Sequence, residues 1–126
     1  MAKRILYKSH CTPQEQVDAD GRYYLDSDCG RKLTGSNLYE LGADTTATGT
    51  LTSSAAIGTT IDFIAVTATS ITSDATVHVS LDNNSTVPIQ LLEGECFASK
   101  IASGAEPYVR ITNNSGSASV DYMTGT

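Results

Sequence analysis

Short runs in which apolar and polar residues alternate fill the chain after residue 59, and they constrain its fold more than any other feature. In one run, Val77, Val79 and Leu81 occupy every second position. Side chains two residues apart lie on the same face of an extended strand, so this alternation predicts strands with one buried face. About a quarter of the chain is Ser or Thr, and β-branched Thr also favours extended backbone.

The runs and the turns between them together predict an architecture. We expect five or six strands, at residues 60–67, 76–81, 87–91, 96–101, 108–112 and 118–122. Segments 82–85 and 113–116 are rich in Asn, which tolerates positive φ, so we expect each to turn a hairpin. Pro88 cannot donate a ladder hydrogen bond, so its strand is expected at an edge or with a bulge. The pattern predicts an all-β fold, an antiparallel β-sandwich of jelly-roll-like type.

The first 41 residues lack this alternation and contain spaced apolar residues in a polar segment. Four of the six tyrosines lie here, and such a segment cannot bury a core by itself. We interpret residues 1–41 as an extended N-terminal interaction arm, 42–58 as a linker or first strand, and 59–126 as the β-sandwich domain. The arm could pair with the sandwich edge or lie across a neighbouring subunit. We favour the second alternative because Tyr gives a large contact area at low entropic cost.

The expected contact residues of the arm are Ile5, Leu6, Tyr7, Tyr23, Tyr24 and Tyr39.

The charge of the chain disfavours nucleic acid and anionic membranes as partners. The net charge is −6, and residues 42–126 supply all of it, because basic and acidic residues balance in residues 1–41. An acidic chain disfavours nucleic acid and anionic membranes as partners. No stretch approaches the roughly 20 apolar residues of a membrane helix, and the opening residues lack the apolar run of a secretion signal. We therefore expect a protein that is made in a cytoplasm.

Three cysteines and a neighbouring histidine raise the possibility of a metal site or a disulfide. Structural zinc sites use ligand pairs separated by two to four residues, whereas His10 and Cys11 are adjacent and 17 residues separate Cys11 from Cys29. Cys96 could supply a fourth ligand, but the spacing does not fit, so we expect no metal. A Cys11–Cys29 disulfide is a second interpretation, but we favour free thiols in packed contacts, since the odd count indicates no disulfide framework.

Candidate catalytic groups have ordinary structural explanations. His78 lies within a predicted strand, on the face opposite Val77 and Val79, where a solvent-facing polar residue is expected. Glu93 and Glu95 flank a predicted turn rather than a cleft. Aligning Gly21 with the glycine of a calcium-binding loop leaves both essential carboxylate positions without a carboxylate. We therefore expect no enzyme activity, no catalytic residues, no bound cofactor and no metal.

Several short motifs in residues 60–126 resemble a known group of proteins. They are a V-x-V-S-L-D strand at residues 77–82, a P-I-x-L return at 88–91, G-E at 94–95 and a closing S-G-S-A-x-V hairpin at 115–120. Together they resemble the small β-sandwich virion proteins of tailed bacteriophages. These include capsid decoration proteins and head or tail accessory proteins. The resemblance lies in the succession of short strands and turns over these residues, and it transfers no catalytic residue.

The resemblance implies a non-enzymatic capsid decoration (cement) protein, made in the host cytoplasm and carried in the virion. Such a protein stabilises the phage head through intersubunit contacts, as a homo-oligomer (dimer or trimer) bound to the major capsid protein or another virion protein. Neither nucleic acid nor membrane is an expected partner. A tail, baseplate or fibre accessory protein is the alternative. A carbohydrate-binding module is the alternative from another class, although the chain has no Trp and few aromatic residues after residue 60.

Overall fold

The structure, a computed structural model, describes residues 3–16, 19, 21–42 and 46–126. All regular secondary structure in these residues is β, which confirms the predicted fold class. The chain forms two compact units, one built mainly from residues 40–126 and the other from residues 5–39. We call the first unit the sandwich and the second the ribbon.

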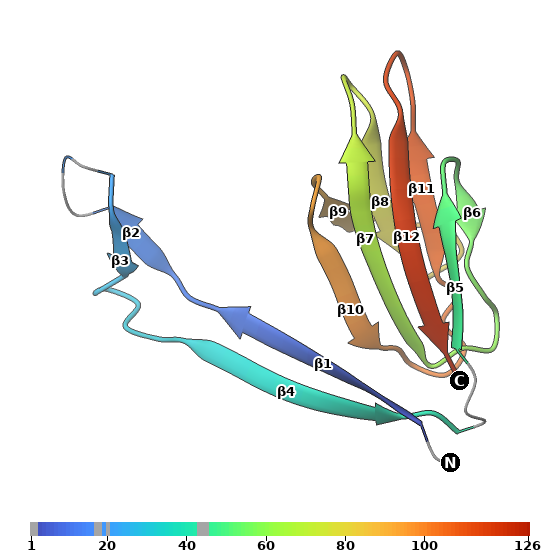
Figure 1. Cartoon of the computed structure of the whole chain (residues 1–126), viewed down its shortest axis with the longest axis horizontal. Coiled ribbons are helices and arrows are strands. Elements are labelled where there is room, and N and C mark those ends of the chain that lie inside the picture. The colour runs from blue at the N-terminus through green and yellow to red at the C-terminus, as the bar shows by residue number, and fades with distance from the viewer. Residues whose placement is uncertain (1–2, 17–18, 20, 43–45) are drawn as a thin grey trace. The chain divides into compact units, whose positions relative to one another are not determined.

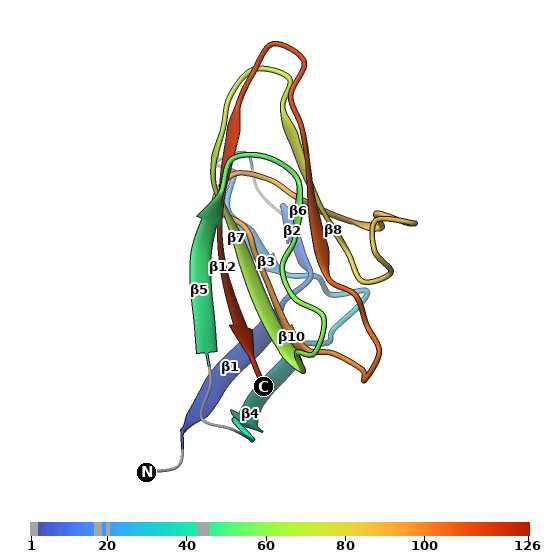
Figure 2. The same cartoon turned by 90° about the vertical axis from the view of Figure 1, so that its right-hand side faces the viewer.

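The sandwich contains two four-stranded sheets whose paired strands are all antiparallel (Figures 1 and 2). The first sheet has the order β10-β7-β12-β5, with strands β5 (Thr46–Leu51), β7 (Phe63–Ile71), β10 (Cys96–Lys100) and β12 (Ala118–Gly125). The second has the order β6-β11-β8-β9, with strands β6 (Ala55–Ala56), β8 (Thr76–Ser80), β9 (Ile89–Leu91) and β11 (Tyr108–Thr112). Residues 46–51 and 55–56, in the segment interpreted as a linker or first strand, thus form edge strands of the two sheets.

The core lies between the sheets and follows the predicted alternation. In the second sheet, Val77 of β8 pairs with Ile111 of β11, and both side chains belong to the buried cluster. The first sheet contributes Ile64 and Val66 of β7 and Val120 of β12, each with 0% of its surface exposed. Burial of apolar surface contributed by both layers is what stabilises a sandwich of this kind.

The turns follow residue chemistry where the chain reverses within a sheet. Asn83 and Asn84, with φ of 55° and 68°, connect β8 to β9. The predicted strand at 87–91 shortens to β9, which begins directly after Pro88 and lies at a sheet edge. The missing N–H of Pro88 therefore removes no bond from the ladder.

The predicted hairpin at 113–116 is wrong. β11 and β12 lie in different sheets, and the segment between them crosses from one sheet to the other. Its end is fastened to the β7–β8 loop, because the Asp74 carboxylate accepts the N–H groups of Ser115 (2.9 Å) and Gly116 (3.0 Å). Turn composition predicts that the chain reverses, but it does not determine whether the next strand pairs with the previous one or with another sheet.

The ribbon consists of two strand pairs, one long and one short (Figure 1). Strands β1 (Arg4–Cys11) and β4 (Leu33–Glu40) form one pair, and strands β2 (Gln14–Gln16) and β3 (Tyr23–Leu25) form the other. In the second pair, Glu15 lies opposite Tyr24 in an antiparallel register. No second layer covers either pair from within residues 5–39 as far as they are described.

Candidate functional site

Exposed apolar side chains concentrate on the ribbon. Among the described residues, eight large hydrophobic side chains are exposed, and six of them lie between residues 5 and 39. Their exposed fractions are Leu6 55%, Tyr23 58%, Tyr24 48%, Leu25 38%, Leu33 60% and Leu38 56%. Contiguous apolar exposure is typical of interaction sites in proteins, whereas single exposed apolar residues are normal.

The two long strands of the ribbon carry part of this surface. The Lys3 carbonyl accepts the N–H of Leu41 at 3.0 Å, immediately beside the ends of β1 and β4. An antiparallel register that continued without interruption from this pair would place Leu6 beside Leu38. A shallow depression lined by residues 8–10 and 34–36 agrees with this register. Leu6 of β1 and Leu38 of β4 are both exposed, so each strand of this pair contributes an apolar side chain to the surface.

The short pair β2–β3 exposes both of its faces. Tyr23 and Leu25 share one face of β3 because they are two residues apart, and Tyr24 lies on the other face. All three side chains are exposed. A two-stranded pair without a covering layer is marginally stable in water. The tyrosines therefore remain available for contact with another surface.

The contact residues predicted from the sequence fall into three groups. Leu6, Tyr23 and Tyr24 are exposed, Ile5 and Tyr7 are half-buried, and Tyr39 is buried with 7% exposure. Tyr39 therefore offers little surface to a partner in this structure. The prediction missed three further exposed leucines, at positions 25, 33 and 38. Leu33 and Leu38 could have been found from residues 33–40, because one lies at an odd and the other at an even position, so neither face of an extended strand there is wholly polar. Leu25 directly follows Tyr23 and Tyr24, which the prediction included.

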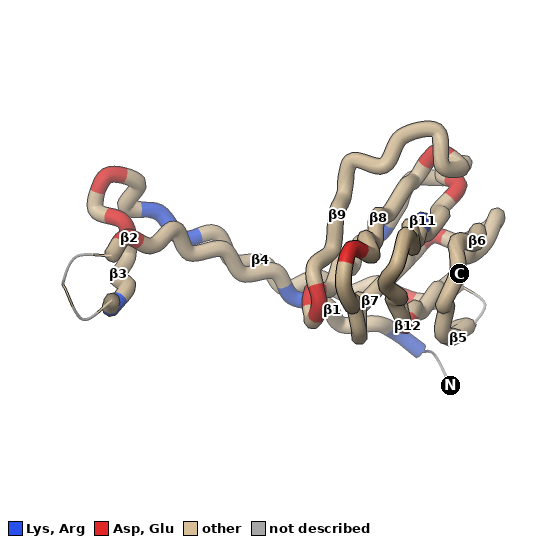
Figure 3. Tube along the Cα trace, turned by 90° about the horizontal axis from the view of Figure 1, so that it is seen from above, with Lys and Arg blue, Asp and Glu red and all other residues tan. Residues whose placement is uncertain are grey.

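Charge distinguishes the ribbon from the sandwich. Four of the eight Lys and Arg residues lie in residues 5–39, beside five Asp and Glu residues, so the ribbon is close to neutral, and Figure 3 shows both signs of charge on it. In the sandwich, Lys100 and Arg110 are outnumbered by acidic residues. A mixture of apolar patches and both signs of charge is typical of a protein interface with a polar rim.

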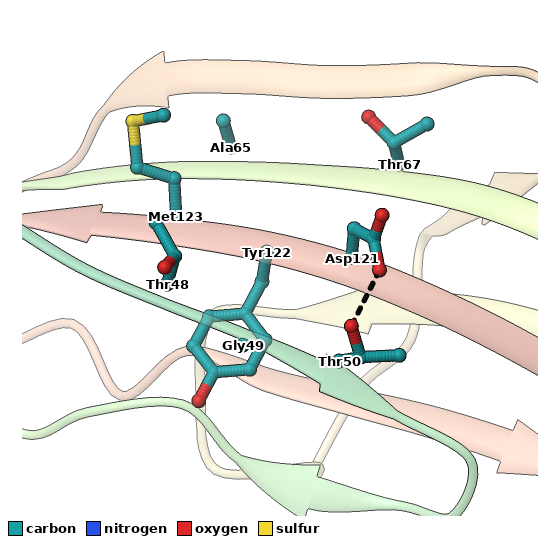
Figure 4. A pocket seen from close by; sticks show the side chains of 8 residues that line it. All are labelled: Thr48, Gly49, Thr50, Ala65, Thr67, Asp121, Tyr122 and Met123. Atoms are coloured by element: carbon teal, nitrogen blue, oxygen red, sulfur yellow. Dashed lines mark hydrogen bonds between the residues drawn. The ribbon is translucent and has the colours of Figure 1, made fainter.

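A shallow depression of about 430 Å³ lies on the first sheet of the sandwich (Figure 4). Its lining residues are Thr48, Gly49, Thr50, Ala65, Thr67, Asp121, Tyr122 and Met123. The one carboxylate among them, Asp121, accepts a hydrogen bond from the Thr50 hydroxyl at 2.7 Å. The Tyr122 ring passes so close to Gly49 that a β-carbon there would lie 2.6 Å from the Tyr122 oxygen. The lining contains no His, Cys or Lys.

The candidate catalytic groups of the sandwich serve its turns. The Ser80 hydroxyl donates to Asp82 (2.6 Å) and accepts the Asn84 N–H (3.0 Å), so it is committed to the β8–β9 turn. His78 lies opposite Arg110 in the ladder, and its Nδ1 is buried without a hydrogen-bond partner.

Glu93 and Glu95 each accept a backbone N–H, from Ile71 (3.0 Å) and Leu92 (2.9 Å). These bonds explain the two carboxylates as turn-stabilising groups.

The cysteines divide between the two units. All three thiols are free and exposed, and Cys11 and Cys29 line one small depression of about 100 Å³ in the ribbon. His10 lies next to Cys11 in sequence, and its Nε2 is 3.1 Å from the Thr12 hydroxyl. Within the described part of the chain, no group of three His, Cys, Asp or Glu residues is arranged to hold a metal. Asp18 and Asp20, considered as calcium ligands, lie outside the described residues.

The chain was compared with known protein families, proteins and structures, and no relative was found. No protein-family model matches the chain, and no curated protein or solved structure matches it at a significant level. The residues described include no helix with the length and hydropathy of a membrane span.

Proposed function

We propose that this chain is a non-enzymatic virion structural protein, a capsid decoration protein that stabilises a phage head through intersubunit contacts. The observation that carries the proposal is the ribbon, whose six exposed apolar side chains lie on a segment without a core of its own. Folding leaves such surface in water at a cost unless a partner covers it. The partner in this proposal is the major capsid protein or a sister subunit, and the ribbon acts as the arm that reaches it.

The topology of the sandwich supports the same proposal. The sheet orders β10-β7-β12-β5 and β6-β11-β8-β9 place alternate strands of the chain in opposite sheets, apart from the β8–β9 hairpin. This is the arrangement of an eight-stranded jelly roll, a fold used in viral capsid proteins and also in lectins. We propose that the sandwich is of this type. Because one fold serves many functions, the ribbon carries the functional argument and the topology supports it.

A carbohydrate-binding module is the alternative from another class, and the aromatic residues of the sandwich disfavour it. Phe63 is 1% exposed, and Phe97 and Tyr122 pack against the core. Tyr108, the remaining aromatic residue after residue 60, is half-buried. An exposed aromatic platform of the kind that stacks on sugars is therefore missing from the described sandwich. Specific binding of the full chain on a glycan array would reverse this ranking.

Shell binding by full-length variants tests the proposal. The double variants L6S/L38S and Y23S/Y24S remove apolar contact area from the two halves of the ribbon. Binding is measured by co-sedimentation with shells assembled without the protein. Each double variant is expected to weaken binding about ten-fold or more, because buried apolar anchors dominate interface energies.

The matched control is Leu92→Ser, which removes a leucine that is 59% exposed in the sandwich. This control is expected to bind like the unmodified chain. If both ribbon variants also bind undiminished, the ribbon is not the contact and the proposal fails. The number of copies of this chain per virion distinguishes the shell from the tail. A number close to that of the major capsid protein favours decoration, whereas a few copies per particle favour a tail, baseplate or fibre protein.

A further inference from the structure

Two cysteines that are distant in sequence line one depression of the ribbon. Cys11 is the last residue of β1, and Cys29 lies in the turn between β3 and β4. Both line the small depression of about 100 Å³, together with Pro13, Arg31 and Leu33. Both thiols are exposed, so a reagent in solution reaches them.

The backbone around Cys29 is held in place by Asp26. The Asp26 side chain accepts the N–H of Asp28 at 2.9 Å and, more weakly, that of Cys29 at 3.4 Å. The Asp26 carbonyl accepts the N–H of Gly30 at 2.7 Å, and Gly30 has a φ of 60°, which glycine adopts without steric cost. Asp26 thus folds the turn that presents Cys29.

The same turn is tied to the segment that follows Cys11. The N–H of Asp26 donates to the Pro13 carbonyl at 2.9 Å. The Glu15 carboxylate accepts both the N–H (3.1 Å) and the hydroxyl (2.9 Å) of Ser27. These bonds bridge the two segments within two to four residues of each thiol, so the fold of the ribbon holds the segments that carry the two cysteines beside each other.

We propose that Cys11 and Cys29 form a reversible disulfide that closes residues 12–28 into a loop. The thiolate of one cysteine attacks a small-molecule disulfide such as glutathione disulfide, which releases one glutathione thiol and leaves a mixed disulfide. The second cysteine then attacks the protein sulfur of that mixed disulfide and releases the second glutathione. The two protein thiols lose two electrons and two protons, and the glutathione disulfide gains them.

The bridge joins the end of β1 to the turn after the β2–β3 pair. This part of the chain has little buried surface, so a covalent link would restrict it more than its own packing does. Oxidation would therefore fix the segment that carries Tyr23 and Tyr24. The proposal concerns these residues alone and stands whether or not the ribbon binds a capsid.

Peptide mapping of the full chain tests the bridge. The protein is equilibrated with glutathione disulfide or with dithiothreitol, quenched in acid, alkylated and digested with trypsin. Cleavage after Lys8, Arg22 and Arg31 separates Cys11 (residues 9–22) from Cys29 (residues 23–31). The oxidised sample is expected to contain these two peptides joined, lighter than their sum by two hydrogen atoms, and the reduced sample to contain both alkylated.

The third cysteine provides the control. Cys96 of β10 is exposed and belongs to the sandwich, so it reports reagent access without the ribbon geometry. Cys96→Ser is expected to leave the joined peptides unchanged, whereas Cys11→Ser is expected to leave Cys29 alkylated or singly glutathionylated. Joining of either ribbon peptide to the Cys96 peptide overturns the proposal. So does an oxidised monomer in which Cys11 and Cys29 each carry glutathione.

Discussion

The sandwich and the ribbon are built from the same element, the antiparallel strand pair, yet they bury their side chains to opposite extents. Val77 and Val79 of the sandwich are 0% exposed, whereas Leu6 and Leu38 of the ribbon are 55% and 56% exposed. In both units, successive side chains of a strand point to opposite faces, and neighbouring strands are joined by ladder hydrogen bonds. The difference is that each sandwich sheet has a second sheet against its apolar face.

The comparison separates what strand pairing supplies from what a covering layer supplies. Pairing satisfies backbone groups and sets the register, but each such hydrogen bond adds little net stability in water. Burial of apolar surface adds most of the stability, and it requires the second layer. The ribbon therefore has backbone order without a core, and its apolar side chains remain available to a partner.

The largest expected effect tests whether burial really differs between the two units. Ile64→Ala removes fully buried atoms from the core and should lower the free energy of unfolding by about 2–5 kcal/mol. Leu6→Ala, at an exposed ribbon position, should change it by no more than about 0.5 kcal/mol. Urea denaturation followed by circular dichroism measures both. A cost for Leu6→Ala as large as that for Ile64→Ala would show that the ribbon is covered in solution.

A pair of glycines gives a smaller and more local test. A β-carbon at Gly116 would collide with the Thr72 carbonyl oxygen, because the β7–β8 loop lies directly against this position. Gly116→Ala should therefore lower the free energy of unfolding by about 1–3 kcal/mol, as overpacking does. At Gly35 of the ribbon, the nearest atom to an added β-carbon is the Asn37 amide nitrogen at 3.8 Å, an ordinary contact.

Gly35→Ala should consequently stay within about 0.5 kcal/mol of the unmodified chain in the same urea titration. Equal costs at the two glycines would contradict the contrast between a crowded sandwich and an open ribbon.

Sequence reasoning recovered the sandwich better than the ribbon, for a physical reason. Alternation around Val77 and Val109 reports directly on burial, because a two-layer fold needs one apolar face per strand. The order of strands depends on contacts between residues far apart in the chain. The turn at 113–116 therefore gave no sign that β12 pairs with β7 and β5 instead of β11.

The candidate site was recovered in part. Counting tyrosines drew attention to Tyr23 and Tyr24, which are exposed, and equally to Tyr39, which is buried. Residue type cannot distinguish these cases, because Tyr serves both cores and interfaces. The proximity of Cys11 and Cys29 depends on the Asp26 turn, and the spacing of the cysteines alone did not reveal that turn.

The smallest expected effect comes from two aspartates that organise turns, Asp82 in the sandwich and Asp26 in the ribbon. The Ser80 hydroxyl, followed by the N–H and hydroxyl of Thr86, donates to Asp82 and lowers its pKa from 3.8 to about 2. A folded-state pKa below the unfolded value means that ionised Asp82 favours folding above pH 3.8. This contribution is lost as the pH falls from about 4 to about 2.

Asp82→Asn keeps one acceptor oxygen and removes the charge, so it resembles the protonated aspartate. The difference in melting temperature between the unmodified chain and this variant should have its largest value above about pH 4. It should decrease as the pH falls towards 2. The pKa of Asp74 is also lowered, chiefly by the N–H of Ser115, but Asp74 is present in both proteins and its contribution cancels in the difference. Thermal unfolding at closely spaced pH values measures the effect, and carbon NMR of the Asp82 carboxyl measures its pKa directly.

Asp26→Asn sharpens the comparison, because the hydrogen bonds of Asp26 lie within the ribbon and hold none of the sandwich together. Its substitution should leave the melting temperature of the sandwich unchanged at neutral pH while speeding hydrogen exchange at the Asp28 amide. A difference between unmodified and Asp82→Asn protein that stays constant down to pH 2 would contradict the role of the Asp82 charge. A drop in melting temperature with Asp26→Asn would mean that the two units unfold together, and the ribbon would then contribute to the stability of the sandwich despite its exposed side chains.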